Sequence, residues 1–318
     1  MKIYRSLSSF PENEKISLVI GNFDGVHLGH CEIIRECRKN GGICAVLTFD
    51  IHPREFLFPD FPPGRLTLKH EKYTFLERLG VDVIFELPFA QFHSIEPIAF
   101  LDLLNNSLDI GSITVGFNFF FGRNQTGSAD LLYWWGRSSG VKITVVPPFV
   151  KNGMRVSSTA IREFILEGEL IKSQSFLLFP YVISGEVMKG DQIGRQLNFP
   201  TLNQSVPNKM VPPDGVYLTQ TVFDGHQKRS IANIGHRPTI DSEFCERRIE
   251  TWIVDEKIDE MYGRSISVYF LKKIRNEIKF SSKEKLAERI LDDRMKFVEF
   301  WKDSKINELP EIKYSFDA

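Results

Sequence analysis

The chain has 318 residues, more than one domain usually contains, so two domains are expected; its 42% hydrophobic and 25% charged residues are typical of a globular protein. The net charge of −1 gives no bulk electrostatic reason to expect binding to nucleic acid or a membrane surface. Because no signal-peptide core, membrane-length apolar run or CxxC pair is visible, we expect a cytoplasmic protein with reduced thiols.

The first half alternates apolar runs with segments of helical spacing. Strands are predicted over residues 16–20, 43–49, 81–87, 112–116 and 141–146, and helices over 31–39, 68–80, 97–108 and 158–168. This alternation is typical of an α/β, Rossmann-like fold, in which helices cover both faces of a parallel sheet. Ligands of such sheets bind beyond the carboxyl ends of the strands.

The second half consists mainly of short strand-like runs separated by turn signals. These runs cover residues 181–190, 215–225, 228–235, 247–255 and 265–275. They predict an antiparallel β-barrel or sandwich, followed by a C-terminal helix that Ser281 or Ser282 caps. The apolar stripe of that helix comprises Leu286, Ile290, Phe297 and Trp301. We place the boundary near residue 180, giving domains 1–180 and 181–318.

The motif GNFDGVHLGH, residues 21–30, follows the strand predicted over 16–20. If a helix begins near Gly29, then His27, His30 and the first free backbone amides face one point, which suits a phosphate. An ordinary turn is the second interpretation, and a metal site is the third because no third ligand is evident nearby. The other residues of this loop expected at a nucleotide site are Gly21, Asn22, Phe23 and Asp24. Asp24 would fix the turn or contact ribose, and an ordinary Asp-Gly turn explains it equally well.

A second potential anion site lies in VSSTAIRE, residues 156–163. Ser157, Ser158 and Thr159 can cap a helix whose first turn is followed by Arg162. Taken alone, the segment is better explained as an ordinary helix cap. Two phosphate-suited helix starts in one parallel-sheet domain nevertheless favour a nucleoside triphosphate as the ligand.

These motifs, together with LTFDIHP (47–53) and VGFNFFFG (115–122), resemble the adenylyltransferase half of bacterial bifunctional FAD synthetases, nucleotidyltransferases with an HxGH hallmark. The resemblance implies that His27 and His30 contact the ATP phosphates, that Asn118 orients the reacting groups, and that Ser158, Thr159 and Arg162 hold the outer phosphates. This sequence departs from the common pattern at Asn118 (often Asp), Gln125 (often Arg) and Ile51 (often Pro).

The second half resembles the riboflavin kinase module of the same enzymes through GDQIGRQLNFPTLN (190–203), PPDGVY (212–217), NIGHRPT (233–239) and MYGRSISVYF (261–270). Gly190, Gly194 and Arg195 then belong to a loop over the nucleotide phosphates. Thr201 and Asn203 offer oxygen ligands for Mg²⁺. Without the resemblance, a glycine-containing hairpin with a Pro-Thr turn is the better explanation.

Three further positions of the kinase half follow from the resemblance. Glu250 matches the general base, and Arg275 matches a flavin-contacting arginine, although an arginine within KKIRNE is usually solvated. Trp252 stands where relatives often have histidine, and Asn198 replaces a common glycine.

The resemblance implies one enzyme with two ATP-dependent activities: riboflavin to FMN, then FMN to FAD with release of pyrophosphate. Riboflavin, FMN, FAD, ATP, ADP and pyrophosphate are the expected ligands, Mg²⁺ is the expected cofactor, and neither nucleic acid nor a membrane is an expected partner. The alternatives are a riboflavin kinase with a weak or inactive adenylyltransferase half, and a non-catalytic flavin-binding protein.

Overall fold

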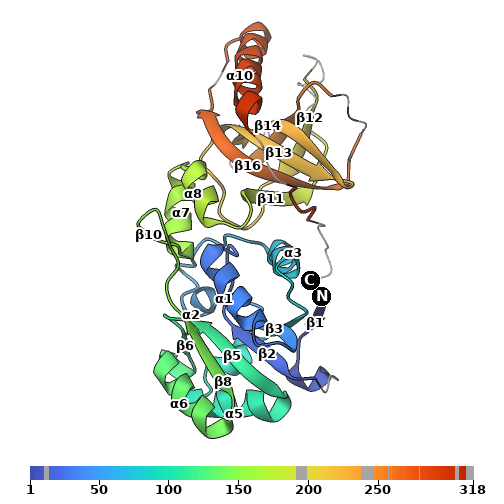
Figure 1. The fold of residues 1–318 in the computed structure, drawn as a ribbon. Coiled ribbons are helices and arrows are strands. Elements are labelled where there is room, and N and C mark those ends of the chain that lie inside the picture. Colours follow the sequence, from blue (N-terminus) through green and yellow to red (C-terminus); the bar gives the residue numbers. More distant parts are fainter. Residues whose placement is uncertain are drawn as a thin grey trace. The chain divides into compact units, whose positions relative to one another are not determined.

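The computed structural model describes residues 1–10, 14–190, 199–237, 246–256, 258, 260–278, 280–304 and 308–312 (Figure 1). Packing divides the chain into two units. The first unit comprises residues 1–64 and 72–158, and the second comprises residues 65–71 and 159–318. This division follows packing alone, and the functional boundary near residue 180 stays a prediction.

The first unit is built on a six-stranded, fully parallel sheet with strand order β1-β4-β3-β2-β5-β8. Its strands are β1 (Lys2–Tyr4), β2 (Ile16–Ile20), β3 (Ile43–Phe49), β4 (Val83–Leu87), β5 (Ile110–Gly116) and β8 (Lys142–Val146). Four short strands, β6 (Phe120–Phe121), β7 (Gly127–Ser128), β9 (Val150–Lys151) and β10 (Met154–Arg155), form two small hairpins. The predicted parallel sheet is confirmed.

Helices cover both faces of this sheet. The helices of this half are α1 (Leu28–Arg38), α2 (Pro53–Leu57), α3 (Lys69–Arg78), α4 (Phe89–Phe92), α5 (Pro97–Ser107) and α6 (Ala129–Ser139), with 3-10 turns at Leu7–Ser9 and Arg123–Gln125. Leu18 of β2 belongs to a core cluster with Leu104 of α5 and Leu132 of α6. On the other face, Cys37 of α1 donates a hydrogen bond to the carbonyl of Ser17. Successive residues of a strand point to opposite faces, so β2 serves both layers.

Sequence reasoning missed several elements, among them β1, α6 and α8 (Leu170–Phe176). Helix α6 has recognisable ends, because Ser128 accepts a hydrogen bond from the amide of Leu131 and Gly140 has a φ of 73°. However, Tyr133 and Trp134 are 49% and 65% exposed. Aromatic residues on the outer face obscure the apolar stripe by which a helix is recognised.

The second unit contains a six-stranded antiparallel sheet of order β11-β16-β13-β14-β15-β12, curled into a half-barrel. An isolated bridge between Met188 and Asn203 joins the chain after β11 to β12, so that the two edges of the sheet meet there. The elements of this half are α7 (Ser158–Leu166), α8, β11 (Tyr181–Glu186), β12 (Thr201–Ser205), β13 (Gly215–Phe223), β14 (His226–Arg237), β15 (Glu246–Ile253), β16 (Ser265–Arg275) and α10 (Lys283–Asp303).

Helix α10 packs against one face of this sheet. Ser282 caps it by accepting a hydrogen bond from the amide of Lys285, as predicted. Phe297 and Trp301 lie in one cluster with Trp252 of β15 and Leu218 of β13. The predicted antiparallel barrel with a C-terminal helix is confirmed. Among the described residues, no helix combines the length and apolar character needed to cross a membrane.

Residues 65–71 pack with the second unit through a buried ion pair. The side chains of Glu71 and Lys209 are both fully buried, and the Lys209 ammonium lies 2.6 Å from a Glu71 carboxylate oxygen. Glu71 also accepts hydrogen bonds from the amide of Leu68 and from the amide and hydroxyl of Ser184, and His70 contacts that hydroxyl at 2.7 Å. These bonds supply the partners that a buried charge requires.

Candidate active sites

The GNFDGVHLGH loop leaves the carboxyl end of β2, in the interior of the parallel sheet. From β2 the chain passes to β3 and β4 on one side, and only then to β5 and β8 on the other. The strand order therefore reverses between β2 and β5. Ligands of doubly wound sheets bind at such a reversal, beyond the carboxyl ends of the strands.

The backbone of this loop is held in an unusual conformation. Phe23, Gly25 and Val26 have φ angles of 52°, 86° and 40°. A left-handed conformation is strained for a β-branched residue, and such strain gathers at functional sites. Phe23 and Val26 are 1% and 0% exposed, so their burial in the core holds the loop in place. A β-carbon at Gly21 would lie 3.2 Å from the Phe23 ring.

His27 and His30 lie side by side at the start of α1. His27 is the N-cap residue, and its Nδ1 accepts a hydrogen bond from the amide of His30 at 3.2 Å. The two rings stack with centroids 3.6 Å apart and planes 13° apart. Gly29 permits this arrangement, because a β-carbon there would approach the His27 ring to 3.1 Å.

The electrostatic environment keeps His30 neutral at pH 7. Burial lowers the pKa of His30 well below its ordinary value, and the nearby charges of His27 and then Lys72 lower it further. Its Nδ1 is buried without a hydrogen-bond partner among the residues that the structure describes. A neutral imidazole carries one N–H donor and one acceptor.

Ser158, the first residue of α7, fixes the loop from outside. Its hydroxyl donates a hydrogen bond of 2.9 Å to the carbonyl of Asp24, whose side chain is buried. Ser157 precedes the helix and is half-buried. Thr159 and Arg162 follow along α7, among the residues that pack with the second unit.

Asn118 lies beyond the carboxyl end of β5, the strand next to β2. It is exposed, and a β-carbon at Gly116 would lie 3.6 Å from its Oδ1 and 3.3 Å from Ile33 of α1. Asn118 therefore lies at the same edge of the sheet as the histidine loop. Its orienting role stays a prediction.

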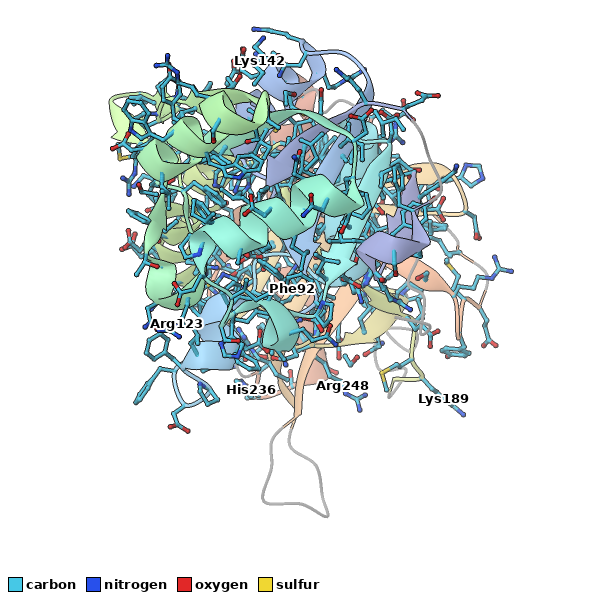
Figure 2. All side chains as sticks on the ribbon, turned by 90° about the horizontal axis from the view of Figure 1, so that it is seen from below. Phe92, Arg123, Lys142, Lys189, His236 and Arg248 are labelled. Carbon is cyan, nitrogen blue, oxygen red and sulfur yellow. The ribbon has the colours of Figure 1, made fainter. Side chains whose placement is uncertain are left out.

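The structure shows the local conformation at two positions, Ile51 and Gln125, where this sequence departs from the common pattern of the adenylyltransferase motifs. Ile51 donates its amide to Asp50 Oδ1 at 2.8 Å, a hydrogen bond that proline could not make. Gln125 has a φ of 57° in the 3-10 turn that begins at Arg123 (labelled in Figure 2).

The geometry does not favour a metal bound by the histidine pair. Within the described part of the chain, the group of side chains close enough to share an ion is Asp214, His236 and Glu277, with His236 labelled in Figure 2. No third ligand accompanies His27 and His30 in those residues. Moreover, Arg247 donates to Asp214 at 2.7 Å, so a cation already occupies that carboxylate.

In the second unit, register across the sheet brings the predicted kinase residues together. Asn203 of β12 lies directly opposite Glu250 of β15, and Glu250 lies opposite Asn233 of β14. Thr201 precedes Asn203 by two residues on the same strand, so both side chains share its face. Sequence reasoning considered a Pro-Thr turn at this point and did not predict β12.

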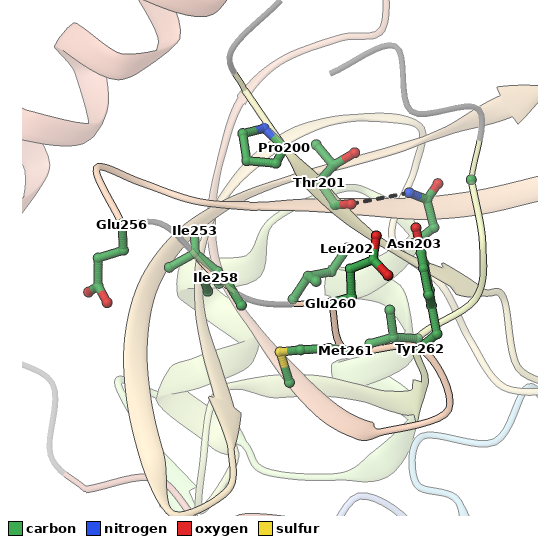
Figure 3. Close-up of a pocket in the computed structure, with 12 residues that line it drawn as sticks. Pro200, Thr201, Leu202, Asn203, Ile253, Glu256, Ile258, Glu260, Met261 and Tyr262 are labelled. Carbon is green, nitrogen blue, oxygen red and sulfur yellow. Dashed lines mark hydrogen bonds between the residues drawn. The ribbon is translucent and has the colours of Figure 1, made fainter. Parts of the chain in front are cut away.

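A pocket of about 50 Å³ adjoins this face (Figure 3). Gly190, Thr201 and Asn203 line it, and the Asn203 amide nitrogen donates to the Thr201 carbonyl at 3.4 Å. The amide oxygen of Asn203 is thus the atom that can face a cation. Gly194 and Arg195 lie outside the described residues.

Glu260 lines the same pocket and was missed by sequence reasoning. It lies in the irregular segment between β15 and β16, just before Met261 and Tyr262. The signal available in the sequence was a carboxylate next to the MYGR motif.

Arg275 forms an ion pair with Asp293 of α10 and is not solvated. The guanidinium Nε and Nη2 both donate to the Asp293 carboxylate, at 2.8–3.0 Å. The Arg275 and Asp293 side chains are 10% and 4% exposed. The pair therefore ties the end of β16 to α10, and the flavin contact stays a prediction.

Comparison with protein families gives two matches that together cover most of the chain. Residues 9–160 match the FAD synthetase family, and residues 177–301 match the riboflavin kinase family.

Individual relatives align along nearly the whole chain. A bifunctional riboflavin kinase/FMN adenylyltransferase from Escherichia coli K12 is 36% identical, covering 95% of this chain and 98% of its own. One from Pseudomonas fluorescens is 34% identical, covering 92% and 96%. A crystal structure described as a macrolide-efflux protein from Streptococcus pneumoniae has a TM-score of 0.83 at 28% identity, covering 95% and 99%.

Proposed function

The chain belongs to the family of bifunctional riboflavin kinase/FMN adenylyltransferases, and from this premise we propose which residues carry its two reactions. It is an FAD-biosynthesis enzyme with both activities. The proposed substrates are riboflavin, FMN and ATP, and the products are FMN, ADP, FAD and pyrophosphate. The proposed location is the cytoplasm, which the free thiols of Cys31, Cys37 and Cys44 support.

The N-terminal domain predicted over residues 1–180 carries FMN adenylylation. A phosphate oxygen of FMN attacks the α-phosphorus of ATP, the bond to the bridging oxygen breaks, and the electron pair leaves with pyrophosphate. His27 and His30 bind ATP phosphates, and Asn118 orients the reacting groups. The observation that carries this assignment is the stacked histidine pair on a strained loop at the strand-order reversal. Such a reaction depends on positioning and charge stabilisation.

In this assignment Ser158 stabilises the shape of the loop through Asp24. Thr159 and Arg162 bind the outer phosphates. Because His30 is held neutral, it contributes a hydrogen bond and no fixed positive charge. Positive charge for the phosphates is expected from other groups, Arg162 among them.

The second unit carries riboflavin phosphorylation. Glu250 takes the proton from the riboflavin 5′-hydroxyl as that oxygen attacks the γ-phosphorus of ATP, and ADP leaves. The register of Asn203 opposite Glu250 supports this role, since it sets the base beside the proposed metal ligands. Thr201 and Asn203 fit a magnesium ion, because both offer hard oxygen atoms on one strand face. When bound with ATP, Mg²⁺ would neutralise phosphate charge.

One assay tests the assignment. Riboflavin, ATP and Mg²⁺ are supplied, and the flavin products are separated by chromatography. His30→Ala is expected to accumulate FMN without FAD. Glu250→Ala is expected to make no FMN from riboflavin, yet to make FAD when FMN is supplied. FMN alone from the wild-type protein would contradict the adenylyltransferase assignment, and phosphorylation by Glu250→Ala near the wild-type rate would contradict the base.

A further inference from the structure

Lys72, on α3, reaches the first unit's histidine loop from the β3 side. Its ammonium donates a hydrogen bond of 3.3 Å to the hydroxyl of Thr48, near the end of β3. Thr48 is 1% exposed, and its hydroxyl donates in turn to the carbonyl of Asn22 at 3.5 Å. A cation is thus joined through one buried hydroxyl to the backbone of the GNFDGVHLGH loop.

The charge of Lys72 also influences the pKa of His30. Lys72 is among the causes that lower the pKa of His30, after burial and His27. Lys72 is half-buried, so its charge is less screened than that of a surface lysine.

We propose that Lys72 is a catalytic residue of the adenylyltransferase, whose ammonium contacts phosphate oxygens of FMN or ATP during adenylyl transfer. The proposal rests on the function assigned above to the histidine pair. Two anionic phosphates must approach each other at this site, and the neutral imidazole of His30 does not offset their repulsion. A fixed ammonium does so, and it is most effective where water is excluded.

Lys72 gives up no proton in this step. The new bond joins an FMN phosphate oxygen to the α-phosphorus, and the broken bond releases pyrophosphate with its electron pair. The ammonium stays charged throughout and stabilises the negative charge on the transferring or leaving oxygens. Its hydrogen bond to Thr48 fixes its position before the substrates arrive.

The test compares three variants of the full chain. Lys72→Met removes the charge and keeps the aliphatic length, Lys72→Arg keeps a charge of different shape, and Arg78→Met is the control from the exposed end of the same helix. We expect Lys72→Met to reduce FAD formation from FMN by about 10²–10³-fold. Lys72→Arg should lose less, and Arg78→Met should stay near wild type. Riboflavin phosphorylation should be unchanged in all three.

Steady-state kinetics distinguish the two phosphate sources. A larger KM for FMN in Lys72→Met indicates contact with the FMN phosphate, and a larger KM for ATP indicates contact with the triphosphate. An unchanged KM with a lower kcat indicates contact made in the transition state, with either source. NMR titration of His30 gives a further readout, because its pKa should rise when the charge of Lys72 is removed.

Two results would overturn the proposal: FAD formation by Lys72→Met within threefold of wild type, or an equal loss in Arg78→Met. Calorimetric titration with pyrophosphate distinguishes failure of the Lys72 proposal from failure of the proposed adenylyltransferase function. If the wild-type protein forms no FAD but binds pyrophosphate more tightly than Lys72→Met does, the assigned reaction is wrong and the phosphate contact stands. Equal pyrophosphate affinity without turnover would reject both.

Discussion

Gly190 lies against the side-chain amide of Asn203, so closely that a β-carbon at position 190 would come within 2.5 Å of Asn203 Nδ2. This contact gives a packing reason for glycine at that point, in addition to loop flexibility. The amide it supports is the one whose oxygen is proposed to bind Mg²⁺.

Gly190→Ala is therefore expected to displace the Asn203 amide and to lower riboflavin kinase activity by at least about tenfold, with a higher Mg²⁺ concentration needed for half-maximal rate. Initial rates measured over a range of Mg²⁺ concentrations check this expectation. FAD formation from supplied FMN serves as the internal control and should not change. An unaltered Mg²⁺ dependence would show that the amide does not serve the metal.

Ser158→Ala should weaken adenylylation through the loop. It removes the hydroxyl that holds the Asp24 carbonyl at 2.9 Å. We expect a loss of about 1 kcal/mol in the free energy of unfolding, typical of one hydrogen bond, and a larger relative fall in FAD formation than in FMN formation. Ser158→Thr keeps the hydroxyl and is the matched control. Equal loss of both activities would argue against a local effect.

The ion pair between Arg275 and Asp293 should contribute strongly to stability. Asp293→Asn leaves a nearly buried guanidinium without its counter-charge, which costs about 3–5 kcal/mol. Urea denaturation measures this loss. The exposed pair of Arg264 and Asp224 provides the control, since Arg264→Met should cost less than about 1 kcal/mol. Similar losses at the two sites would contradict the interpretation.

His30 should give the protein a pH-dependent stability. Its pKa in the folded chain lies well below its ordinary value of about 6.5, so between these two values the unfolded chain binds more protons. The free energy of unfolding should therefore fall as pH drops below about 6.5 and stay level above it, as far as this group is concerned. His70, whose pKa is also lowered by burial, adds a slope of the same sign.

The comparison of wild type with His30→Gln isolates the contribution of His30. Urea denaturation of both proteins at several pH values should give a stability difference that narrows or reverses in acid, because the variant lacks this titrating group. Parallel pH profiles for the two proteins would show that the environment of His30 does not perturb its protonation.

Much of the fold could be predicted because local patterns and packing agree. The strands at Ile16–Ile20 and Ile43–Phe49 have the predicted bounds, since their apolar runs are buried on both faces of a parallel sheet. Strand β12 was not predicted, because Leu202 is the one apolar residue in Thr201–Ser205, which leaves no apolar pattern to recognise. The segment forms a strand because it pairs with β15, and its own sequence does not indicate this pairing.

The candidate sites were less accessible to sequence reasoning where they depend on tertiary position. The HxGH spacing indicated that His27 and His30 would face one point, and they stack. Lys72 was not predicted, since it lies in the middle of a helix and belongs to the site only through Thr48. Arg275 was expected either on the surface or at the flavin, because Asp293 is distant in sequence and nothing local indicates their pairing.

The buried pair of Glu71 and Lys209 has a consequence for how the chain can be divided. Glu71 comes from a seven-residue segment that precedes most of the parallel-sheet unit in sequence, yet its carboxylate lies beside a lysine of the barrel unit. A fragment that begins at residue 159 or 181 would bury the Lys209 ammonium without its carboxylate, at a cost of about 3–5 kcal/mol. Cutting the polypeptide at one point therefore cannot give a complete second unit. A fragment that begins at residue 159 or 181 should regain stability when a peptide containing residues 65–71 is added.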